Sequence, residues 1–371
     1  ASMPRSLQPD RKLFYVTLAL CLIGVVMVFS ASAVTAKQMY GNGYVFLERQ
    51  LVFLALGLFG MIRSMNFDYR KLRQPRIIYP SIALTLLMLI GVLFLDRTHA
   101  THRWIHAGPL SLQPSEFAKL VVILYFAWFL ELRSRPGGVG VNDWKHTLLP
   151  ALGPVVVMLA LILREPDLGT SCMIFLVAVA MLFEAGLSMK YIAGLAAAAV
   201  PAIWLLIIHA QYRYDRVLAF FSPDADPQGR GFQLLQSLIA VGSGGLSGVG
   251  LMESKQKLFY LPEAHTDFIF AVTCEELGFI GALVIVALFG VYAWRGFRAA
   301  FRAPDVFGRL LALGITTLVA GQALVNLSVV LGLMPTKGIP LPFISYGGSS
   351  LLVMLLATGV LLNISQHAEA V

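Results

Sequence analysis

Charged residues are scarce in this chain. Lys, Arg, Asp and Glu make up 13% of its 371 residues, whereas a soluble domain carries about 25%. Hydrophobic residues account for 58%, and the mean hydropathy is +0.77. This balance excludes an ordinary soluble enzyme or binding domain and indicates an integral membrane protein.

Cysteine is nearly absent as well. The three cysteines, Cys21, Cys172 and Cys274, all fall within apolar runs and form no CxxC pair. They provide neither a disulfide framework nor a metal-binding motif, so we interpret them as small core residues.

Apolar stretches long enough to cross a bilayer recur along the chain. A spanning helix needs about 17–25 predominantly apolar residues. We identify ten such stretches, at approximately 13–33, 46–64, 77–95, 115–132, 147–163, 168–185, 190–208, 267–294, 308–333 and 346–364. The predicted fold is therefore an all-α polytopic membrane protein that forms one transmembrane domain over residues 1–371.

The net charge of +8 follows the predicted topology. Basic residues cluster near 5–12, 63–76, 133–145, 190 and 295–309, and these clusters alternate with loops that contain few of them. Because Lys and Arg are enriched in cytoplasmic loops, both termini are predicted to be cytoplasmic. The excess charge thus needs no nucleic acid partner.

The longest predicted extracytoplasmic loop covers residues 209–266, between the seventh and eighth spans. Loops of this length are usually functional or disordered. Within it, Phe232–Val241 has the pattern of an amphipathic interfacial helix. Gly242–Gly250 lacks the Lys and Ser/Thr of a phosphate loop, and we interpret it as a mobile turn in a lid.

Ionisable residues gather at the predicted outer end of the eighth span, where Glu263, His265 and Asp267 precede an apolar run. An ionisable side chain at bilayer depth costs roughly 2.5–3.5 kcal/mol, so it marks a functional site by default. Thr266 or Asp267 could instead cap the following helix, a role that both residue types fill well. The local sequence leaves both interpretations open.

A second polar pair lies in the fourth span. Glu116 and Lys119 are spaced i, i+3 and share one helix face. They are predicted near the outer boundary, and we expect Lys119 to lie close to Asp267. A structural ion pair that fixes helix packing is the alternative. Because the ionisable groups collect at one face of the membrane, the pattern favours an outward-facing site over a transport path.

Four motifs, in this order along the chain, resemble one known family. They are RWIHAGPLSLQPSEFAKL (Arg103–Leu120), REPDLGTS (Arg164–Ser171), LPEAHTDFIFAVTCEELG (Leu261–Gly278) and PLPFISYGGSS (Pro340–Ser350). With the ten spans and the late outer loop, they are similar to the SEDS proteins (shape, elongation, division and sporulation) over nearly the whole chain. The segments that resemble the division branch more than the elongation branch are Val26–Ala33, Thr336–Ser350 and Leu361–His367.

The resemblance implies a bacterial peptidoglycan glycosyltransferase that polymerises lipid II at the outer face of the cytoplasmic membrane. The catalytic aspartate of the family falls on Asp267, and its polar pair falls on Glu116 and Lys119. The reaction would be an inverting displacement of the lipid diphosphate. Asp267 would act as a general base or as a ligand of Mg²⁺ or Mn²⁺, and no organic cofactor is expected.

Other polar residues are candidates for binding or supporting the substrate. Arginine suits the diphosphate because it makes bidentate contacts. The remaining candidates are Arg49, Arg103, Glu263, His265, Arg216 and Lys337.

The chain shows no Ser-x-x-Lys motif on a soluble domain that could crosslink the product. A class B penicillin-binding protein is therefore the expected partner, together with other proteins of the division or elongation complex. Small residues of the eighth and ninth spans, such as Gly281, Gly314 and Gly321, are predicted to face the partner's helix, and packing against this chain's own helices is the alternative. A lipid II flippase and a non-catalytic division scaffold are the alternative functions.

Overall fold

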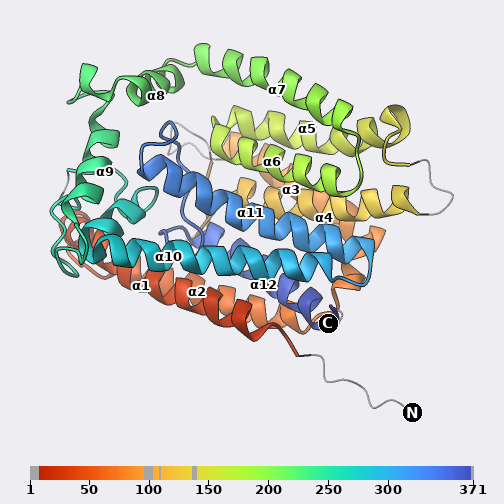
Figure 1. Ribbon diagram of the computed structural model, residues 1–371, viewed down its shortest axis with the longest axis horizontal. Helices are drawn as coiled ribbons and strands as arrows, with labels where there is room; N and C mark the ends of the chain where they lie inside the picture. Colours follow the sequence, from red (N-terminus) through yellow and green to blue (C-terminus); the bar gives the residue numbers. More distant parts are fainter. Residues whose placement is uncertain (1–7, 96–102, 108–109, 136–139, 259, 369–371) are drawn as a thin grey trace.

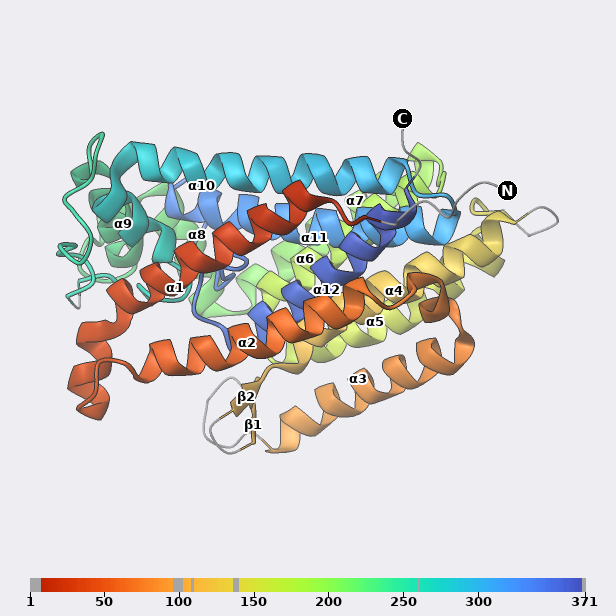
Figure 2. The same cartoon turned by 90° about the horizontal axis from the view of Figure 1, so that it is seen from below.

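The computed structural model describes residues 8–95, 103–107, 110–135, 140–258 and 260–368. Long helices run roughly along one axis and form a bundle (Figures 1 and 2). The helices at the ten predicted spans are α1 (Arg11–Tyr40), α2 (Val45–Met65), α3 (Pro75–Leu95), α4 (Pro114–Ser134), α5 (Leu149–Arg164), α6 (Leu168–Glu184), α7 (Met189–Ile208), α10 (Ile269–Phe301), α11 (Val306–Val330) and α12 (Gly348–His367). The all-α prediction is confirmed.

The remaining described elements are short. They are the helical turns η1 (Tyr69–Arg73), η2 (Trp144–Leu148) and η3 (Pro223–Ala225), the helices α8 (Gln211–Phe221) and α9 (Phe232–Ser243), and the antiparallel strands β1 (Ile105–Ala107) and β2 (Leu110–Leu112). The two strands form a hairpin immediately before α4. Part of the predicted outer loop at 96–114 lies outside the described residues.

Eight helices of the described chain are long and apolar enough to cross a membrane, with η2 and α5 counted as one. α4 is excluded by its ionisable residues, such as Glu116 and Lys119, and α6 has 17 residues. The chain is therefore a multi-pass membrane protein, and crossing by α4 and α6 stays a prediction. Both termini lie at one end of the bundle, whereas α8 and α9 lie at the other (Figure 1).

The segment between α7 and α10, called the outer segment after its predicted side, contains α8, η3 and α9 and packs against the bundle. The residues that α9 buries against the bundle are Leu234, Ser237 and Ala240. The Gly242–Gly250 turn lies so close to α10 that a Cβ at Gly248 would be 2.1 Å from the main-chain oxygen of Glu276. Glycine permits this close approach of two backbones, so the turn packs against α10, and its mobility stays a prediction.

α10 is broken at Gly278, whose φ of 67° and ψ of −167° are not helical. The outer segment fills the break with backbone hydrogen bonds. The N–H of Val249 donates to Glu275 O, and the N–H of Phe279 donates to Gly245 O, both at 2.9 Å. The short first part of α10 is thus fixed in place by the outer segment.

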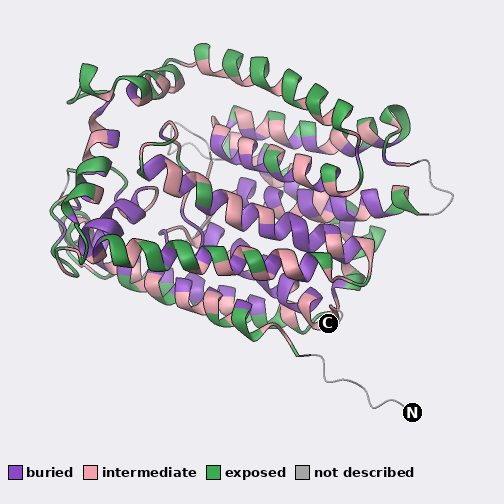
Figure 3. Ribbon diagram, viewed as in Figure 1, coloured by how far each residue is buried: buried purple, intermediate pink, exposed green. Residues whose placement is uncertain are grey.

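α11 lies at the centre of the bundle and is mostly buried (Figure 3). A Cβ at Gly314 would lie 2.7 Å from Ile123 and 2.8 Å from Met181, and one at Gly321 would meet α6 side chains at 3.2 Å. The prediction that these glycines face a partner was wrong, because small residues allow equally close packing within one chain.

Candidate active site

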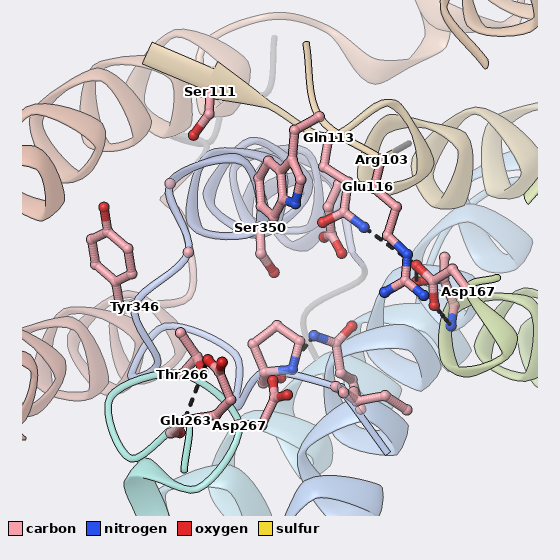
Figure 4. Close-up of a pocket in the computed structure, with 18 of the residues that line it drawn as sticks. Arg103, Ser111, Gln113, Glu116, Asp167, Glu263, Thr266, Asp267, Tyr346 and Ser350 are labelled. Carbon is pink, nitrogen blue, oxygen red and sulfur yellow. Dashed lines mark hydrogen bonds between the residues drawn. The ribbon is translucent and has the colours of Figure 1, made fainter. Parts of the chain in front are cut away.

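A polar cavity of about 350 Å³ lies beside Asp267 (Figure 4). Its walls come from the hairpin and α4, from the segment that precedes α10, and from the segment between α11 and α12. The sequence candidates that line it are Arg49, Arg103, Glu116, Lys119, Glu263 and Asp267. The fold thus brings most of the predicted site together from both halves of the chain.

A second cavity, of about 600 Å³, adjoins the first. The residues that line both are Arg103, Asp167, Glu263, Asp267 and Gly338. The second cavity adds the cationic side chains of Arg213, Arg216 and Lys337. Asp267 therefore lies where a polar chamber meets a cationic one.

An apolar groove of about 340 Å³ runs between α5, α6 and α7. Leu168 and Ile203 line both this groove and the second cavity, so the two spaces adjoin. α7 forms one side of the groove and has no buried residue of its own (Figure 3).

Asp267 does not cap α10. The N-cap residue is Phe268, and no side chain makes a capping hydrogen bond there. Within the described residues no hydrogen bond reaches the carboxylate of Asp267, although its main-chain oxygen accepts one from Asn326 Nδ2 at 2.8 Å. The capping alternative is excluded, and the carboxylate is left for a role in the cavities.

The surroundings of Asp267 favour its neutral form. Burial is the main cause, and it raises the pKa of Asp267 to about 7. The nearby carboxylates of Glu263 and Asp167 raise the pKa further, while Arg216 and Arg103 oppose them. A carboxyl group with a pKa near neutrality is suited to accept a proton at physiological pH.

Lys119 and Glu116 form a buried ion pair in the wall of the first cavity. Lys119 Nζ donates to Glu116 Oε1 at 2.8 Å and to Gln322 Oε1 at 2.9 Å, and both charged side chains are 3% exposed. Lys119 and Asp267 line the same cavity, as their predicted proximity requires, but no hydrogen bond or ion pair joins them among the described residues. Glu116 Oε2 has no hydrogen-bond partner there.

Arg103 is held by the turn between α5 and α6. Its Nε donates to the main-chain oxygen of Glu165 at 2.6 Å, and its Nη2 donates to that of Pro166 at 2.7 Å. The Glu165 side chain is wholly buried and its carboxylate has no partner in the described structure. Burial raises the pKa of Glu165 to about 8, so this residue is neutral at pH 7.

The structure does not place His265 in either cavity lining. Its ring packs against Phe46 at 4.8 Å and Tyr346 at 5.7 Å between centroids. Burial lowers the pKa of His265, against the opposing effect of Glu263. His265 therefore belongs to an aromatic cluster next to the site, whereas its neighbours Thr266 and Asp267 line the cavity.

Sequence reasoning missed two groups of site residues. Asp167 lines both cavities, and its carboxylate accepts hydrogen bonds from Thr170 N at 3.0 Å and Gln113 Nε2 at 3.3 Å. Gln322 lines the first cavity, and Asn326 contacts the backbone of Asp267. The available signal was the i, i+4 spacing of two amides within the apolar ninth span.

A dedicated metal cage is not formed by the described residues, which contain no group of three or more His, Cys, Asp or Glu placed to hold an ion. Mg²⁺ is often held by one or two carboxylates together with substrate phosphates. The carboxylates of Asp267 and Glu263 fit that second mode, because both line the cationic cavity.

Comparison with known proteins extends over nearly the whole chain. A family model for cell cycle proteins of the FtsW, RodA and SpoVE type matches residues 10–370. The probable peptidoglycan glycosyltransferase FtsW of Trichlorobacter lovleyi is 43% identical over 357 residues, which are 96% of this chain and 93% of that protein.

Two solved structures are also similar. One is a chain from a peptidoglycan synthase complex that coordinates polymerization and crosslinking, with 34% identity, a TM-score of 0.77, and coverage of 96% of this chain and 97% of that one. The other is the rod shape determining protein RodA of Thermus thermophilus, with 30% identity, a TM-score of 0.70, and coverage of 99% and 100%. The present chain belongs to the family of FtsW, RodA and SpoVE cell cycle proteins.

Proposed function

We propose that this chain is an inverting peptidoglycan glycosyltransferase that polymerises lipid II at the outer face of the bacterial cytoplasmic membrane. The observation that carries the proposal is the position of Asp267, which lines two adjoining cavities with a carboxylate that is free of helix capping. Two adjoining chambers suit a reaction that joins two large substrates. The activity named for the similar FtsW supports the same conclusion.

Asp267 acts as the general base in this proposal. It takes the proton of the acceptor's 4-hydroxyl while the oxygen attacks the anomeric carbon of the donor, and the bond to the lipid diphosphate breaks. The pKa of about 7 leaves a large fraction of Asp267 ionised at neutral pH and still basic enough to accept the proton.

The second cavity is suited to the donor's diphosphate. Arg103, Arg216 and Lys337 line it, and guanidinium groups bind phosphate oxygens bidentately. A divalent cation, Mg²⁺ or Mn²⁺, would be held by Asp267 and Glu263 together with the diphosphate, where it would supply positive charge for the leaving group. Arg49 and the Lys119–Glu116 pair line the first cavity, which is suited to the acceptor sugar.

The polyprenyl chain of the donor is suited to the apolar groove between α5, α6 and α7. The groove adjoins the cationic cavity, and Leu168 and Ile203 line both. A lipid diphosphate could therefore place its chain among apolar side chains and its charged group beside Asp267.

The partner in this proposal is a class B penicillin-binding protein that crosslinks the product within a division or elongation complex. Support comes from the similar chain in a synthase complex that couples polymerization to crosslinking. The surface we propose for the partner's helix is the eighth span, α10, where Ile280 is 60% and Leu283 54% exposed. The 43% identity to an FtsW supports a role in division.

The decisive experiment is polymerisation of labelled lipid II by the purified protein, with and without its transpeptidase partner, beside Asp267→Asn. We expect glycan strands from the wild type and none from the variant. Lipid II translocation in vesicles that persists in the variant would instead favour the flippase. Full division activity in cells that carry the variant would favour the scaffold.

The outward orientation is tested separately at Ser247, which is exposed in the outer segment. A cysteine introduced there, in a background without the native cysteines, should react with an impermeant thiol reagent in intact cells. Reaction only after lysis would reverse the topology.

A further inference from the structure

Two buried amide side chains of α11 contact the backbone of the site. Gln322 and Asn326 lie about one turn apart, so both point to the same side of the helix. Gln322 is 0% and Asn326 is 2% exposed. Burying an amide group costs free energy unless it is hydrogen-bonded. The side-chain N–H groups of these two residues donate to main-chain oxygens of the site.

Asn326 joins the two segments that meet at Asp267. Its Nδ2 donates to the main-chain oxygens of Asp267 and Ile339, both at 2.8 Å. The adjacent Gly338 packs over the carboxylate, since a Cβ there would lie 3.2 Å from Asp267 Oδ2. One side chain therefore fixes both the backbone that carries the carboxylate and the segment that covers it.

Gln322 holds the Lys119 ammonium in the wall of the first cavity. Its Nε2 donates to Pro340 O at 2.9 Å, and its Oε1 accepts from Lys119 Nζ at 2.9 Å. Glu116 accepts from the same ammonium at 2.8 Å. The Lys119 ammonium is thus held between α4 and α11, and the same amide anchors the segment that begins at Gly338.

We propose that Asn326 is a positioning residue for Asp267 and that Gln322 is a positioning residue for Lys119. The two amides set the separation of carboxylate and ammonium across the first cavity. This inference rests on the proposed polymerase function. Misplacement by about 1 Å can cost about 10²-fold in rate, so the two amides would contribute to catalysis without touching substrate.

The chain offers a matched control in Asn363 of α12. This amide is 3% exposed, its Nδ2 donates to Met65 O at 2.8 Å, and its Oδ1 accepts from Tyr69 N at 3.0 Å. It also joins two backbone segments, but near the opposite end of the bundle. Asn326→Leu and Asn363→Leu therefore remove similar bonds, and only the first removes them from the site.

The first measurement is the kinetics of lipid II polymerisation by the purified full chain. Asn326→Leu should lower kcat by about 10²-fold with KM changed less than about twofold, because chemistry is impaired more than binding. Asn363→Leu should lower the melting temperature by a similar amount while its folded fraction keeps the wild-type kcat. Equal kcat losses in the two variants would overturn the proposal.

The second measurement does not depend on activity. Hydrogen exchange followed by mass spectrometry reports how firmly a backbone segment is held. In Asn326→Leu, exchange should rise at residues 264–268 and 338–341, the two segments whose main-chain oxygens Asn326 Nδ2 binds. In Asn363→Leu, exchange should rise around Tyr69 instead.

The exchange result separates this inference from the proposed function. Absence of polymerisation by the wild type would refute the polymerase, yet raised exchange at these two segments in Asn326→Leu would still show that Asn326 holds them. Unchanged exchange there refutes the positioning role. If that variant does not fold, Asn326→Ala is read by the same two measurements, with Asn363→Ala as its control.

Discussion

Two buried lysine–carboxylate pairs in this protein have nearly the same geometry and different surroundings. Lys119–Glu116 and Lys257–Glu276 each join Nζ and Oε1 at 2.8 Å, with both side chains at 3% exposure or less. The second pair is sealed, because Ser30 Oγ donates to the Glu276 carboxylate at 2.6 Å and accepts from Lys257 Nζ at 3.2 Å.

The first pair is incomplete by comparison. Glu116 Oε2 has no hydrogen-bond partner in the described structure, and both residues line a cavity. A buried pair with satisfied partners links α1, α10 and the outer segment, whereas one with an unused acceptor can still bind substrate. The difference between a structural and a functional ion pair therefore lies in the remaining partners, and the salt bridge alone does not reveal it.

The largest expected effect is at the carboxylate of Asp267, which lines the same cavity as Lys119 and Glu116. Asp267→Asn should lower lipid II polymerisation by about 10²–10⁴-fold, the usual contribution of a general base. Folding should be retained, because Asp267 caps no helix. The measurement is strand synthesis together with the melting temperature. Wild-type strand synthesis by a folded variant would contradict the catalytic assignment.

Substitution of each lysine tests the comparison directly. Lys119→Met should lower the polymerisation rate by about 10²-fold, as loss of one preorganised charge often does. Both single variants should lose about 3–5 kcal/mol of stability, because each leaves a buried carboxylate as an uncompensated charge, but Lys257→Met should keep the wild-type rate per folded molecule. Rate per folded molecule distinguishes the two variants, and the melting temperature measures the loss that both share.

A double substitution gives the control for that test. Lys257→Met with Glu276→Leu should recover most of the stability, because no charge is left unpaired. Lys119→Met with Glu116→Leu should recover stability without recovering the rate. Recovery of the rate in the second double variant would show that the incomplete pair is also structural.

The pH dependence of the rate gives a smaller effect. A general base must be deprotonated, so the rate should be full above pH 7 and fall about tenfold per unit below it, following the raised pKa of Asp267. A base that does not contact the cation gives the same midpoint at all Mg²⁺ concentrations. If Asp267 also holds the cation, more Mg²⁺ displaces the proton and moves the midpoint to lower pH.

Glu165 is a third buried acidic residue, and its carboxyl group has no hydrogen-bond partner in the described structure. Burial raises its pKa from 4.5 to about 8, so the folded state binds more protons than the unfolded state between these values, and stability falls as pH rises through that window. Glu165→Gln should raise the melting temperature above pH 8 and change it little below pH 5. Equal effects at both pH values would show that Glu165 is not buried as described.

The sequence was sufficient for features that depend on local pattern. Hydropathy alone located the ten helices within a few residues, apart from longer ends such as that of α10. Asp267 was identified because an ionisable group beside an apolar run is conspicuous. The i, i+3 spacing in the fourth span identified Glu116 and Lys119, which line the same cavity.

The rest depends on contacts between distant segments. Asn326 looked like an isolated polar residue because its partners are backbone oxygens, which no side-chain pattern reveals. His265 was misplaced because the segment before α10 is not helical, so adjacent residues point to different places. Gly314 was misassigned because a small residue gives the same pattern whether it packs inside the chain or against a partner.

The exposure of α7 has a consequence for the purified protein in detergent or in artificial bilayers. Since none of its residues is buried, much of its surface is left to the surrounding lipid, and a mismatch between its apolar length and the bilayer thickness can change its tilt. Ile203 and Ile207 of this helix also line the cationic cavity. We therefore expect bilayer thickness to affect the shape of that cavity, and a detergent micelle or a short-chain lipid to change it in an assay.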